Sequence, residues 1–298
     1  MPKILPLDKQ LENFEQECFT GKDAKRILRA YNACVDQTQD FVKKSGFSDV
    51  AIGLSGGVDS SLVAKIAVDA FGAEHVHGII LPGPYSSQES MQDAKQLVEN
   101  LGISTNTMFI NSAYEAIVNS LNLAEFPADD VKIKDITSQN IQSRLRMIVL
   151  MAASNEYNWL LLNTANKSEV YTGYSTLYGD MAGGFAPLGD VYKTDVFKMC
   201  ICKNMQERRT YEKDVDVIPQ SIISKPPSAE LTDNQTDEAS LGIDYPTLDA
   251  ILHEYVDNKK TANEIVFLGY SEVQVQNVVT KVKRSEYKRH YEPPCAKI

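Results

Sequence analysis

The sequence has 298 residues, 43% hydrophobic and 23% charged, which is enough for a sizeable core in one large domain or two small ones. A formal net charge of −10 argues against a broad nucleic-acid-binding surface, which would need an excess of basic side chains. Five cysteines without a Cys-x-x-Cys pair argue against a disulfide framework or a zinc site. With no signal segment and no apolar run near the roughly 20 residues that span a bilayer, the sequence predicts a cytoplasmic protein.

The first half of the chain alternates between apolar runs and amphipathic stretches. Residues 1–24 predict an arm or short helix ahead of the main domain, which we expect to span 25–298. Apolar positions spaced by three and four from Ala24 to Lys44 predict a helix that ends at Gly46. Strands are expected at 49–54, 76–81, 104–110 and 159–163, with helices near 60–71, 87–101, 112–123 and 137–157. This alternation predicts a single α/β domain: a doubly wound parallel sheet flanked by helices.

The pattern changes beyond Lys203. Residues 203–227 are charged and show no clear periodicity, and we interpret them as an irregular lid with too few apolar positions to pack on the core unaided. Helices are expected again near 236–257, 261–268 and 271–290. Residues 82–88, after the second strand, are a second candidate lid.

The most informative segment is Ser55-Gly56-Gly57-Val58-Asp59-Ser60, which lies between an apolar strand and an apolar helix. Two glycines ahead of a helix N-terminus form a cradle of N–H groups that suits phosphate. Asp59 stands where a Walker A loop has lysine, and a carboxylate beside phosphate predicts a bridging Mg²⁺ ion. A lone Asp-Ser pair would more simply cap the helix, but the glycines and the strand favour a nucleotide site. The segment resembles the pyrophosphate loop of the N-type ATP pyrophosphatases, which release pyrophosphate from ATP and leave AMP on a substrate.

Three later segments carry further candidates. Asn140 and Arg144 share a helix face, which suits either a polar ligand or a solvent-exposed pair. Asn166 and Glu169 have the spacing of a capping box, and Glu169 is an equally good candidate for a second carboxylate ligand. The glycine-rich stretch at 173–193 implies close approach of its backbone to a ligand.

Together these segments resemble the NAD⁺ synthetase family over roughly residues 25–292. The matching segments are Ser55–Ser60, His77–Pro82, Asn140–Met147, Thr164–Glu169, Tyr178–Lys193, Lys225–Leu231 and Tyr287–Arg289. The resemblance implies ATP-dependent amidation of nicotinic acid adenine dinucleotide (deamido-NAD⁺) to NAD⁺. The reaction would pass through an acyl-adenylate, release AMP and pyrophosphate, and use ammonia as the nitrogen donor.

The resemblance also implies partners. Pro84–Ser87 looks most like the synthetase portion of the glutamine-dependent enzymes. Only about 25 residues precede the shared region, so we expect no glutaminase domain and a poor response to glutamine unless a separate glutaminase supplies ammonia. The apolar helix Leu145–Ala153 is expected to bury against a second copy in a homodimer.

Individual roles follow from the resemblance alone. The residues implied for ATP are Ser55, Gly57, Asp59, Ser60, Ile79, Leu81, Thr164, Lys193 and Ser228, with Mg²⁺ on Asp59 and Glu169. Those implied for deamido-NAD⁺ are Arg144, Asp180 and Lys288, with Thr164 close to both nucleotides. Lys193 would neutralise the departing pyrophosphate and Asp180 would bind and deprotonate ammonium. Gly184 stands where many ammonia-dependent members carry an aspartate.

Two other readings stay open. One is a different ATP-pyrophosphatase amidotransferase, such as a GMP-synthetase-like or tRNA-thiolating enzyme. The tRNA enzyme would need a basic surface and reactive cysteines, for which Cys200 and Cys202 are weak evidence. The other is a non-catalytic nucleotide-binding or interaction protein. Four residues suited to catalysis argue against it: Asp59, Glu169, Asp180 and Lys193.

Overall fold

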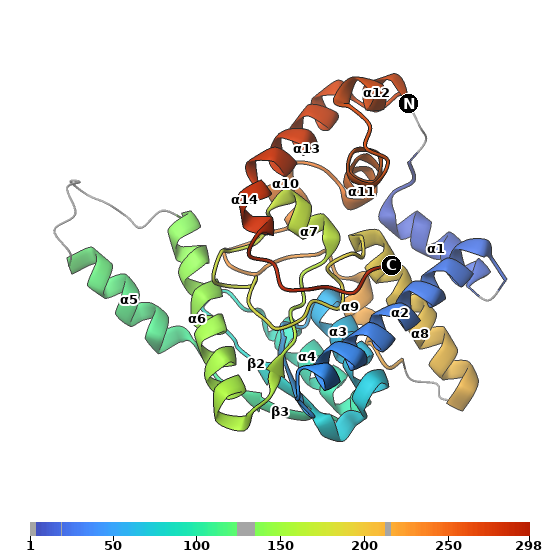
Figure 1. Ribbon diagram of the computed structural model, residues 1–298. Helices are drawn as coiled ribbons and strands as arrows, with labels where there is room; N and C mark the ends of the chain where they lie inside the picture. The colour runs from blue at the N-terminus through green and yellow to red at the C-terminus, as the bar shows by residue number, and fades with distance from the viewer. Residues whose placement is uncertain (1–3, 19, 124–134, 212–215) are drawn as a thin grey trace.

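A four-stranded parallel sheet lies at the centre of the structure, a computed structural model that describes residues 4–18, 20–123, 135–211 and 216–298 (Figure 1). The strand order is β3-β2-β1-β4, with β1 at Val50–Leu54, β2 at Val76–Ile80, β3 at Ser104–Thr107 and β4 at Leu160–Leu161. The helices of these ranges are α1 Leu7–Glu17, α2 Lys22–Lys44, α3 Val58–Phe71, α4 Gln88–Leu101, α5 Asn111–Leu123, α6 Asp135–Tyr157, α7 Lys167–Thr172, α8 Lys193–Tyr211, α9 Gln220–Ser224, α10 Asp237–Leu241, α11 Tyr245–Leu252, α12 Ala262–Phe267, α13 Glu272–Arg284 and α14 Glu286–Arg289.

Helices cover both faces of this sheet because β1 is apolar on both sides. Val50 and Ile52 are fully buried in a core shared with α2, α3 and α8. Ala51 points to the opposite face and packs in a second core, to which Leu145 of α6 belongs. The predicted single-domain α/β fold with a doubly wound parallel sheet is therefore confirmed.

The N-terminal segment forms a helix rather than an arm. Phe14 of α1 and Cys18, which follows it, are buried in the same core as β1. Arg26 of α2 adds a two-pronged contact to Asp195 of α8, with nitrogen–oxygen distances of 2.7 and 2.8 Å. The first two helices thus pack against α8, and α8 carries the candidate residue Lys193 at its N-terminus.

The prediction that residues 203–227 form an irregular insert is wrong for the described part of that range. Helix α8 continues to Tyr211, and Ile218, Ile222 and Ile223 around α9 are buried in the main core. The side-chain amide of Asn204 also donates to the Ile218 carbonyl at 2.7 Å and accepts from its N–H at 2.9 Å. These three isoleucines lie within six residues, and they supply the apolar contacts that the many charged residues of 203–227 made hard to predict.

The C-terminal helices form a smaller core beside the sheet. Leu248 of α11 and Val275 and Val278 of α13 are fully buried in it. The helices expected in this region are present, with breaks at Gly242 and Ser285, and α11 continues into a π-helical turn at His253–Asp257. In the described ranges, no helix combines the length and apolar character that crossing a membrane requires.

Candidate active site

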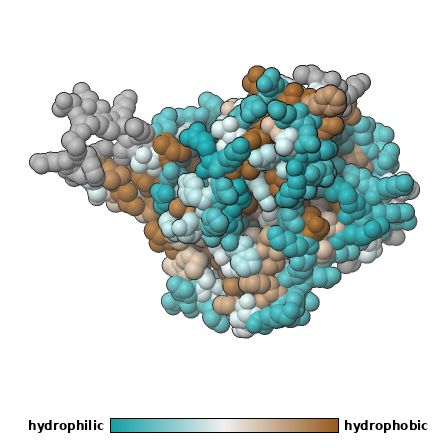
Figure 2. Space-filling view, turned by 45° about the horizontal axis from the view of Figure 1, so that its top comes forward, coloured by the Kyte–Doolittle hydropathy of each residue, from teal (hydrophilic) through white to brown (hydrophobic). Residues whose placement is uncertain are grey.

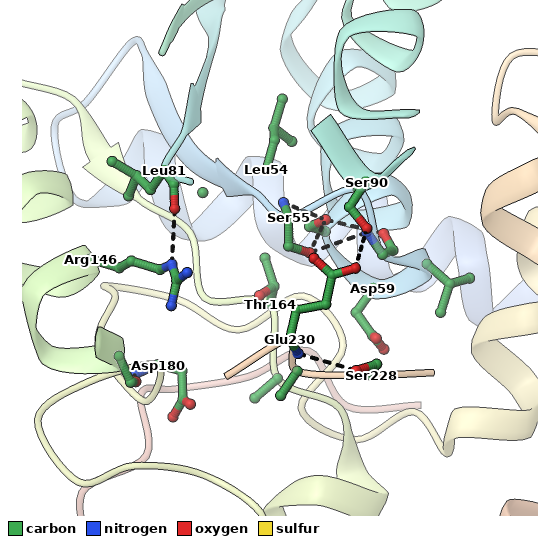
Figure 3. A pocket seen from close by; sticks show the side chains of 18 of the residues that line it. Leu54, Ser55, Asp59, Leu81, Ser90, Arg146, Thr164, Asp180, Ser228 and Glu230 are labelled. Carbon is green, nitrogen blue, oxygen red and sulfur yellow. Dashed lines mark hydrogen bonds between the residues drawn. The ribbon is translucent and has the colours of Figure 1, made fainter. Parts of the chain in front are cut away.

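A cavity of about 300 Å³ opens beyond the carboxyl ends of β1 and β2, where parallel α/β sheets bind their ligands (Figure 3). Most of the predicted site residues line it: Ser55, Gly57, Asp59, Ser60, Ile79, Leu81, Thr164, Glu169, Asp180, Lys193 and Ser228. They come from segments spread over more than half of the chain. The fold therefore brings the predicted ATP residues together around one space, and their individual roles stay predictions.

The glycine loop at 55–60 has the shape of an anion cradle. Gly56 has a φ of +75°, and a Cβ atom there would lie 2.1 Å from the Ser90 carbonyl oxygen, so no side chain fits. Gly57 is the N-cap of α3, and no side chain caps this helix. The alternative that Asp59 or Ser60 merely caps α3 is therefore wrong. The helix N-terminus faces the cavity, where its N–H groups favour an anion.

Asp59, Glu169 and Lys193 form an ion cluster in the cavity wall. The Lys193 ammonium lies 2.5 Å from the Asp59 carboxylate and 3.3 Å from that of Glu169. Asn166 donates to the second Asp59 oxygen at 2.9 Å. Burial raises the pKa of Glu169 to about 8, and the nearby Asp59 charge adds to this shift. Burial acts to lower the pKa of Lys193, but the two carboxylates outweigh it and hold that pKa above its ordinary value.

Both predicted roles of Glu169 are compatible with its geometry. Its N–H donates to the Asn166 side chain at 3.1 Å, and its Oε2 accepts from the Asn166 N–H at 3.2 Å. This capping box is confirmed. The other carboxylate oxygen, Oε1, remains turned toward Lys193.

The same cluster has the donor set of a magnesium site completed by a substrate. Asp59 and Glu169 each turn a carboxylate oxygen to the Lys193 ammonium, so the two carboxylates lie close together, and hard oxygen ligands of this kind suit Mg²⁺. In the described ranges, no group of three or more histidine, cysteine, aspartate or glutamate side chains could hold a metal alone. Mg²⁺ characteristically binds one or two protein carboxylates plus phosphate oxygens, so the two residues fit that ion.

A buried aspartate from α11 supports this cluster from behind. Asp249 accepts from the Ser168 hydroxyl at 2.5 Å and from the Thr194 N–H at 2.8 Å, and Ser168 in turn accepts from the Lys193 N–H at 2.9 Å. These bonds join the N-termini of α7 and α8. Burial raises the pKa of Asp249 to about 6. No local sequence pattern indicated Asp249, because its partners lie 55 and 81 positions away.

Asp180 stands at the other end of the cavity, in the glycine-rich stretch (Figure 3). Its carboxylate accepts from the Thr176 N–H at 2.6 Å, and its own N–H donates to the Ser143 hydroxyl at 2.9 Å. Gly179 makes room for this contact, since a Cβ there would lie 2.3 Å from the Ser143 oxygen. Loss of solvation beside the surrounding protein atoms raises the pKa of the Asp180 carboxyl, while the hydrogen bond from the Thr176 N–H opposes this shift.

Arg144 and Lys288, the other two residues predicted for deamido-NAD⁺, lie outside the cavity lining. The exposed Arg144 donates from Nε to the Leu177 carbonyl at 3.2 Å. Lys288 donates to the carbonyls of Gly173 and Ser175 at 2.9 and 2.6 Å. Both cations thus hold the glycine-rich stretch from its outer side, and their contact with a nucleotide stays a prediction.

Gly184 is explained by packing rather than by a ligand. A Cβ atom at this position would lie 2.5 Å from the Leu160 side chain. Its N–H donates to the Leu161 carbonyl at 2.8 Å, which ties this stretch to the end of β4. An aspartate would not fit here without displacing Leu160.

Among the residues of the cavity wall to which sequence reasoning gave no role, Arg146 and Glu230 make the most informative contacts. Arg146 follows the buried Gln142 by four residues and the buried Ser143 by three, so it shares their face of α6, and that spacing was a usable signal. Glu230 accepts from the Ser87 N–H and hydroxyl and from the Ser90 hydroxyl, at 3.1, 2.8 and 2.6 Å. It thereby fastens 225–231 to the start of α4, a contact that no local pattern predicts.

Comparison with known proteins reveals relatives over most of the chain. Residues 30–292 match the NAD synthase family model. The glutamine-dependent NAD(+) synthetase of Rhodobacter capsulatus is 46% identical over 273 residues, which are 91% of this chain and 49% of that protein. The glutamine-dependent NAD(+) synthetase of Thermotoga maritima is 43% identical over 259 residues, or 87% of this chain and 43% of that protein. The chain therefore spans about half the length of the curated relatives it matches.

Solved structures share the fold. NMN synthetase from Francisella tularensis superposes with a TM-score of 0.71 at 29% identity, covering 88% of this chain and 95% of that one. The glutamine-dependent NAD⁺ synthetase of Acinetobacter baumannii in complex with ADP has a TM-score of 0.61 at 36% identity, covering 91% and 47%. With the glycine loop, the acidic pair and the lysine around one cavity, these matches lead to one conclusion: the chain belongs to the NAD synthase family.

Proposed function

We propose that this chain makes NAD⁺ by ATP-dependent amidation of deamido-NAD⁺ with ammonia, releasing AMP and pyrophosphate. The observation that carries the proposal is that one cavity joins the glycine loop to Asp180 within a chain of the NAD synthase family. The relative from Acinetobacter baumannii, solved with ADP, supports an adenine nucleotide as one substrate.

ATP would occupy the part of the cavity nearest β1 and β2. The N–H groups of the 55–60 loop would bind its phosphates, with help from Ser228 and Thr164. Ile79 and Leu81, at the end of β2, would contact the adenine ring through their apolar surfaces. This orientation directs the phosphates toward Lys193.

The activation step needs charge neutralisation more than covalent chemistry. A carboxylate oxygen of deamido-NAD⁺ bonds to the α-phosphorus, and the pyrophosphate leaves with the electron pair of the broken bond. Magnesium held by Asp59 and Glu169 would supply Lewis-acid stabilisation of the phosphate charge. Lys193, released from its two carboxylates, would pair with the departing pyrophosphate.

Asp180 is suited to the second step. Ammonium must lose a proton before its nitrogen can attack the acyl carbon and displace AMP. The pKa of Asp180 lies above its ordinary value because the surrounding protein disfavours its charge. A carboxylate with a raised pKa is a stronger base than an ordinary aspartate, and Asp180 is accessible from the cavity, so it would bind the ammonium and accept that proton.

Assembly as a homodimer and a cytosolic location complete the proposal. Apolar side chains are exposed on α5 (Ile117), on α6 (Ile136 and Ile148) and just before α5 (Phe109), and apolar side chains gather on that side of the molecule in Figure 2. An exposed apolar patch of this kind marks an interaction surface. All five cysteines are free thiols, which suits a reducing compartment.

The experiment that tests the function follows products by chromatography. Purified protein receives MgATP, an ammonium salt and one acceptor: deamido-NAD⁺, nicotinic acid mononucleotide, xanthosine monophosphate or none. The mononucleotide is included because one structural neighbour is named NMN synthetase. We expect equimolar NAD⁺, AMP and pyrophosphate with deamido-NAD⁺. Release of ADP and phosphate, or turnover with the xanthosine nucleotide alone, would refute the proposal.

The nitrogen donor is tested in the same assay. Ammonium chloride is replaced by glutamine, first alone and then with a separate purified glutaminase. We expect low turnover with glutamine alone and recovery when glutaminase is added. Equal turnover with glutamine and with ammonium would contradict ammonia as the direct donor to this chain.

A further inference from the structure

Among the described residues that line the cavity, one cation has no carboxylate within ion-pair distance. Three basic side chains line it: Arg146, Lys193 and Lys225. Lys193 pairs with Asp59 and Glu169, and Lys225 lies 3.0 Å from the Asp93 carboxylate. Among the described residues, no carboxylate forms an ion pair with Arg146, whose nearest polar partners are neutral oxygens.

Arg146 is nevertheless held in a defined orientation. Its Nε donates to the Leu81 carbonyl at 3.0 Å, and one terminal nitrogen lies 3.5 Å from the Ser86 hydroxyl. The loop passes close to the guanidinium because residue 83 is glycine, where a Cβ would lie 2.8 Å from that nitrogen. One edge of the guanidinium is therefore anchored on the end of β2, and most of its N–H groups stay available.

The surroundings of Arg146 favour an anion. Burial lowers the pKa of the guanidinium to about 10 and outweighs the opposing charges of Glu230 and Asp180, neither of which forms an ion pair with it, so Arg146 stays charged at neutral pH. In Figure 3 the side chain extends from α6 into the cavity, between Leu81 and Asp180. A planar guanidinium in this position matches the two oxygens of a carboxylate or phosphoryl group.

We propose that Arg146 binds the oxyanion at the point where the two substrates react. The ligands named here rest on the proposed function: the anion is the α-phosphoryl group of ATP or the carboxylate of deamido-NAD⁺, which have the same hydrogen-bonding chemistry. Arg146 faces the space between the adenine-side residue Leu81 and Asp180, and the reacting oxygens must meet in that space. Lys193, which in this structure pairs with Asp59 and Glu169, is assigned to the pyrophosphate at the opposite end, where it would exchange those carboxylates for phosphate oxygens.

The experiment measures affinity for two ligand pairs by calorimetry, without turnover. AMP and adenosine differ by the phosphoryl group, and deamido-NAD⁺ and NAD⁺ differ in having a carboxylate or an amide. The proteins are wild type, Arg146→Gln, Arg146→Lys and, as a matched loss of one positive charge, Arg284→Gln on the exposed side of α13. A charge-assisted hydrogen bond corresponds to roughly 10- to 100-fold in affinity.

We expect Arg146→Gln to reduce one of the two affinity ratios by roughly 10-fold or more. Arg146→Lys should reduce the same ratio less, and Arg284→Gln should leave both ratios unchanged. Loss of the AMP preference assigns Arg146 to the α-phosphoryl group, and loss of the deamido-NAD⁺ preference assigns it to the carboxylate. Two unchanged ratios in Arg146→Gln would overturn the proposal.

The same variants test whether Arg146 has a purely structural role. Removing a poorly compensated buried charge should leave the ligand-free melting temperature of Arg146→Gln equal to or above that of wild type. A large drop in melting temperature, with Arg146→Lys restoring stability but both ratios unaltered, would show that Arg146 only supports the 82–88 loop. The assay of product formation tests the proposed function separately. The proposed role of Arg146 and the proposed function can therefore be refuted independently of each other.

Discussion

Lys193 Nζ lies 2.5 Å from an oxygen of Asp59, although the two residues are 134 positions apart in the chain. Glu169 is the second carboxylate on the same ammonium, at 3.3 Å. One positive charge thus faces two negative ones, and the cluster carries an excess of negative charge when both carboxylates are ionised. A divalent cation bound beside the two carboxylates would favour the ionised form of Glu169, which links the ionisation of Glu169 to metal binding.

Asp59→Asn and Glu169→Gln should each lower turnover on the order of 100-fold and raise the Mg²⁺ concentration needed for half-maximal activity. Each change removes a carboxylate that would bind the cation. Steady-state assays across a magnesium titration measure both effects. Asp40→Asn, which removes an exposed carboxylate from α2, is the control for net charge.

Glu169 needs a separate control because it also caps α7. Glutamine keeps an oxygen that can accept from the Asn166 N–H, so Glu169→Gln should melt within a few degrees of wild type. If the variant melts early but is fully active at saturating Mg²⁺, Glu169 is a cap and not a metal ligand.

The buried carboxyl of Asp249 should make stability depend on pH. Its pKa is raised from 3.8 to about 6, so at pH 5 the folded protein holds a proton that the unfolded chain releases. This stabilising contribution is complete below about pH 4 and is lost as the pH rises to about 6, a loss of roughly 3 kcal/mol. Urea unfolding of wild type and Asp249→Asn between pH 4 and pH 7 measures it.

Asp249→Asn has no titrating group at this position, so the difference in unfolding free energy between the two proteins isolates the effect. The wild type should lose stability relative to Asp249→Asn by up to roughly 3 kcal/mol across that range. A difference that stays constant with pH would mean that Asp249 is ionised throughout.

Glu230 should control how firmly the two loops close over the cavity. Glu230→Ala removes the acceptor of three hydrogen bonds from Ser87 and Ser90, so 82–90 and 225–231 should exchange amide hydrogens faster. The KM for ATP should rise roughly tenfold, the cost of losing such contacts at the nucleotide. Hydrogen exchange by mass spectrometry and steady-state kinetics provide the two readouts, with Glu230→Gln as the conservative variant.

The same exchange experiment tests the predicted lids at 82–88 and 203–227. Added ATP and deamido-NAD⁺ together should protect 82–88 and 225–231, which border the cavity. Residues 203–211 belong to α8 and should be protected already without ligand. Unchanged exchange across both loops would show that they do not close over the substrates.

The apolar face of α5 and α6 should hold two copies together. Ile148 is 55% exposed on α6, and replacing it with aspartate would place a charge in the proposed interface. Sedimentation equilibrium should give a dimer for wild type and a weaker dimer or monomer for Ile148→Asp. A monomeric wild type at micromolar concentration would contradict the dimer.

Local patterns in the sequence predicted much of the fold and part of the site. Short continuous apolar runs identify strands such as β1, and period-3.6 apolar patterns identify the helices, because each element must bury its apolar residues. The glycine loop at 55–60 and the capping box of Asn166 and Glu169 were also readable, since their geometry depends on residues within a few positions. The composition of 203–227 led to a wrong prediction of irregular structure, because many charged residues surround the closely spaced isoleucines that begin at Ile218.

Contacts between distant segments were decided by the tertiary structure alone. Arg144 and Arg146 are two positions apart, yet Arg144 is exposed and Arg146 lines the cavity, because α6 turns one inward and the other outward as it packs on the sheet. Asp249 and Glu230 have no local signal, since their partners come from helices whose positions depend on the whole core. The sequence thus determined which chemical groups exist and on which elements they lie. Packing determined which of them meet, because hydrogen bonds and ion pairs act over a few ångströms in space and not along the chain.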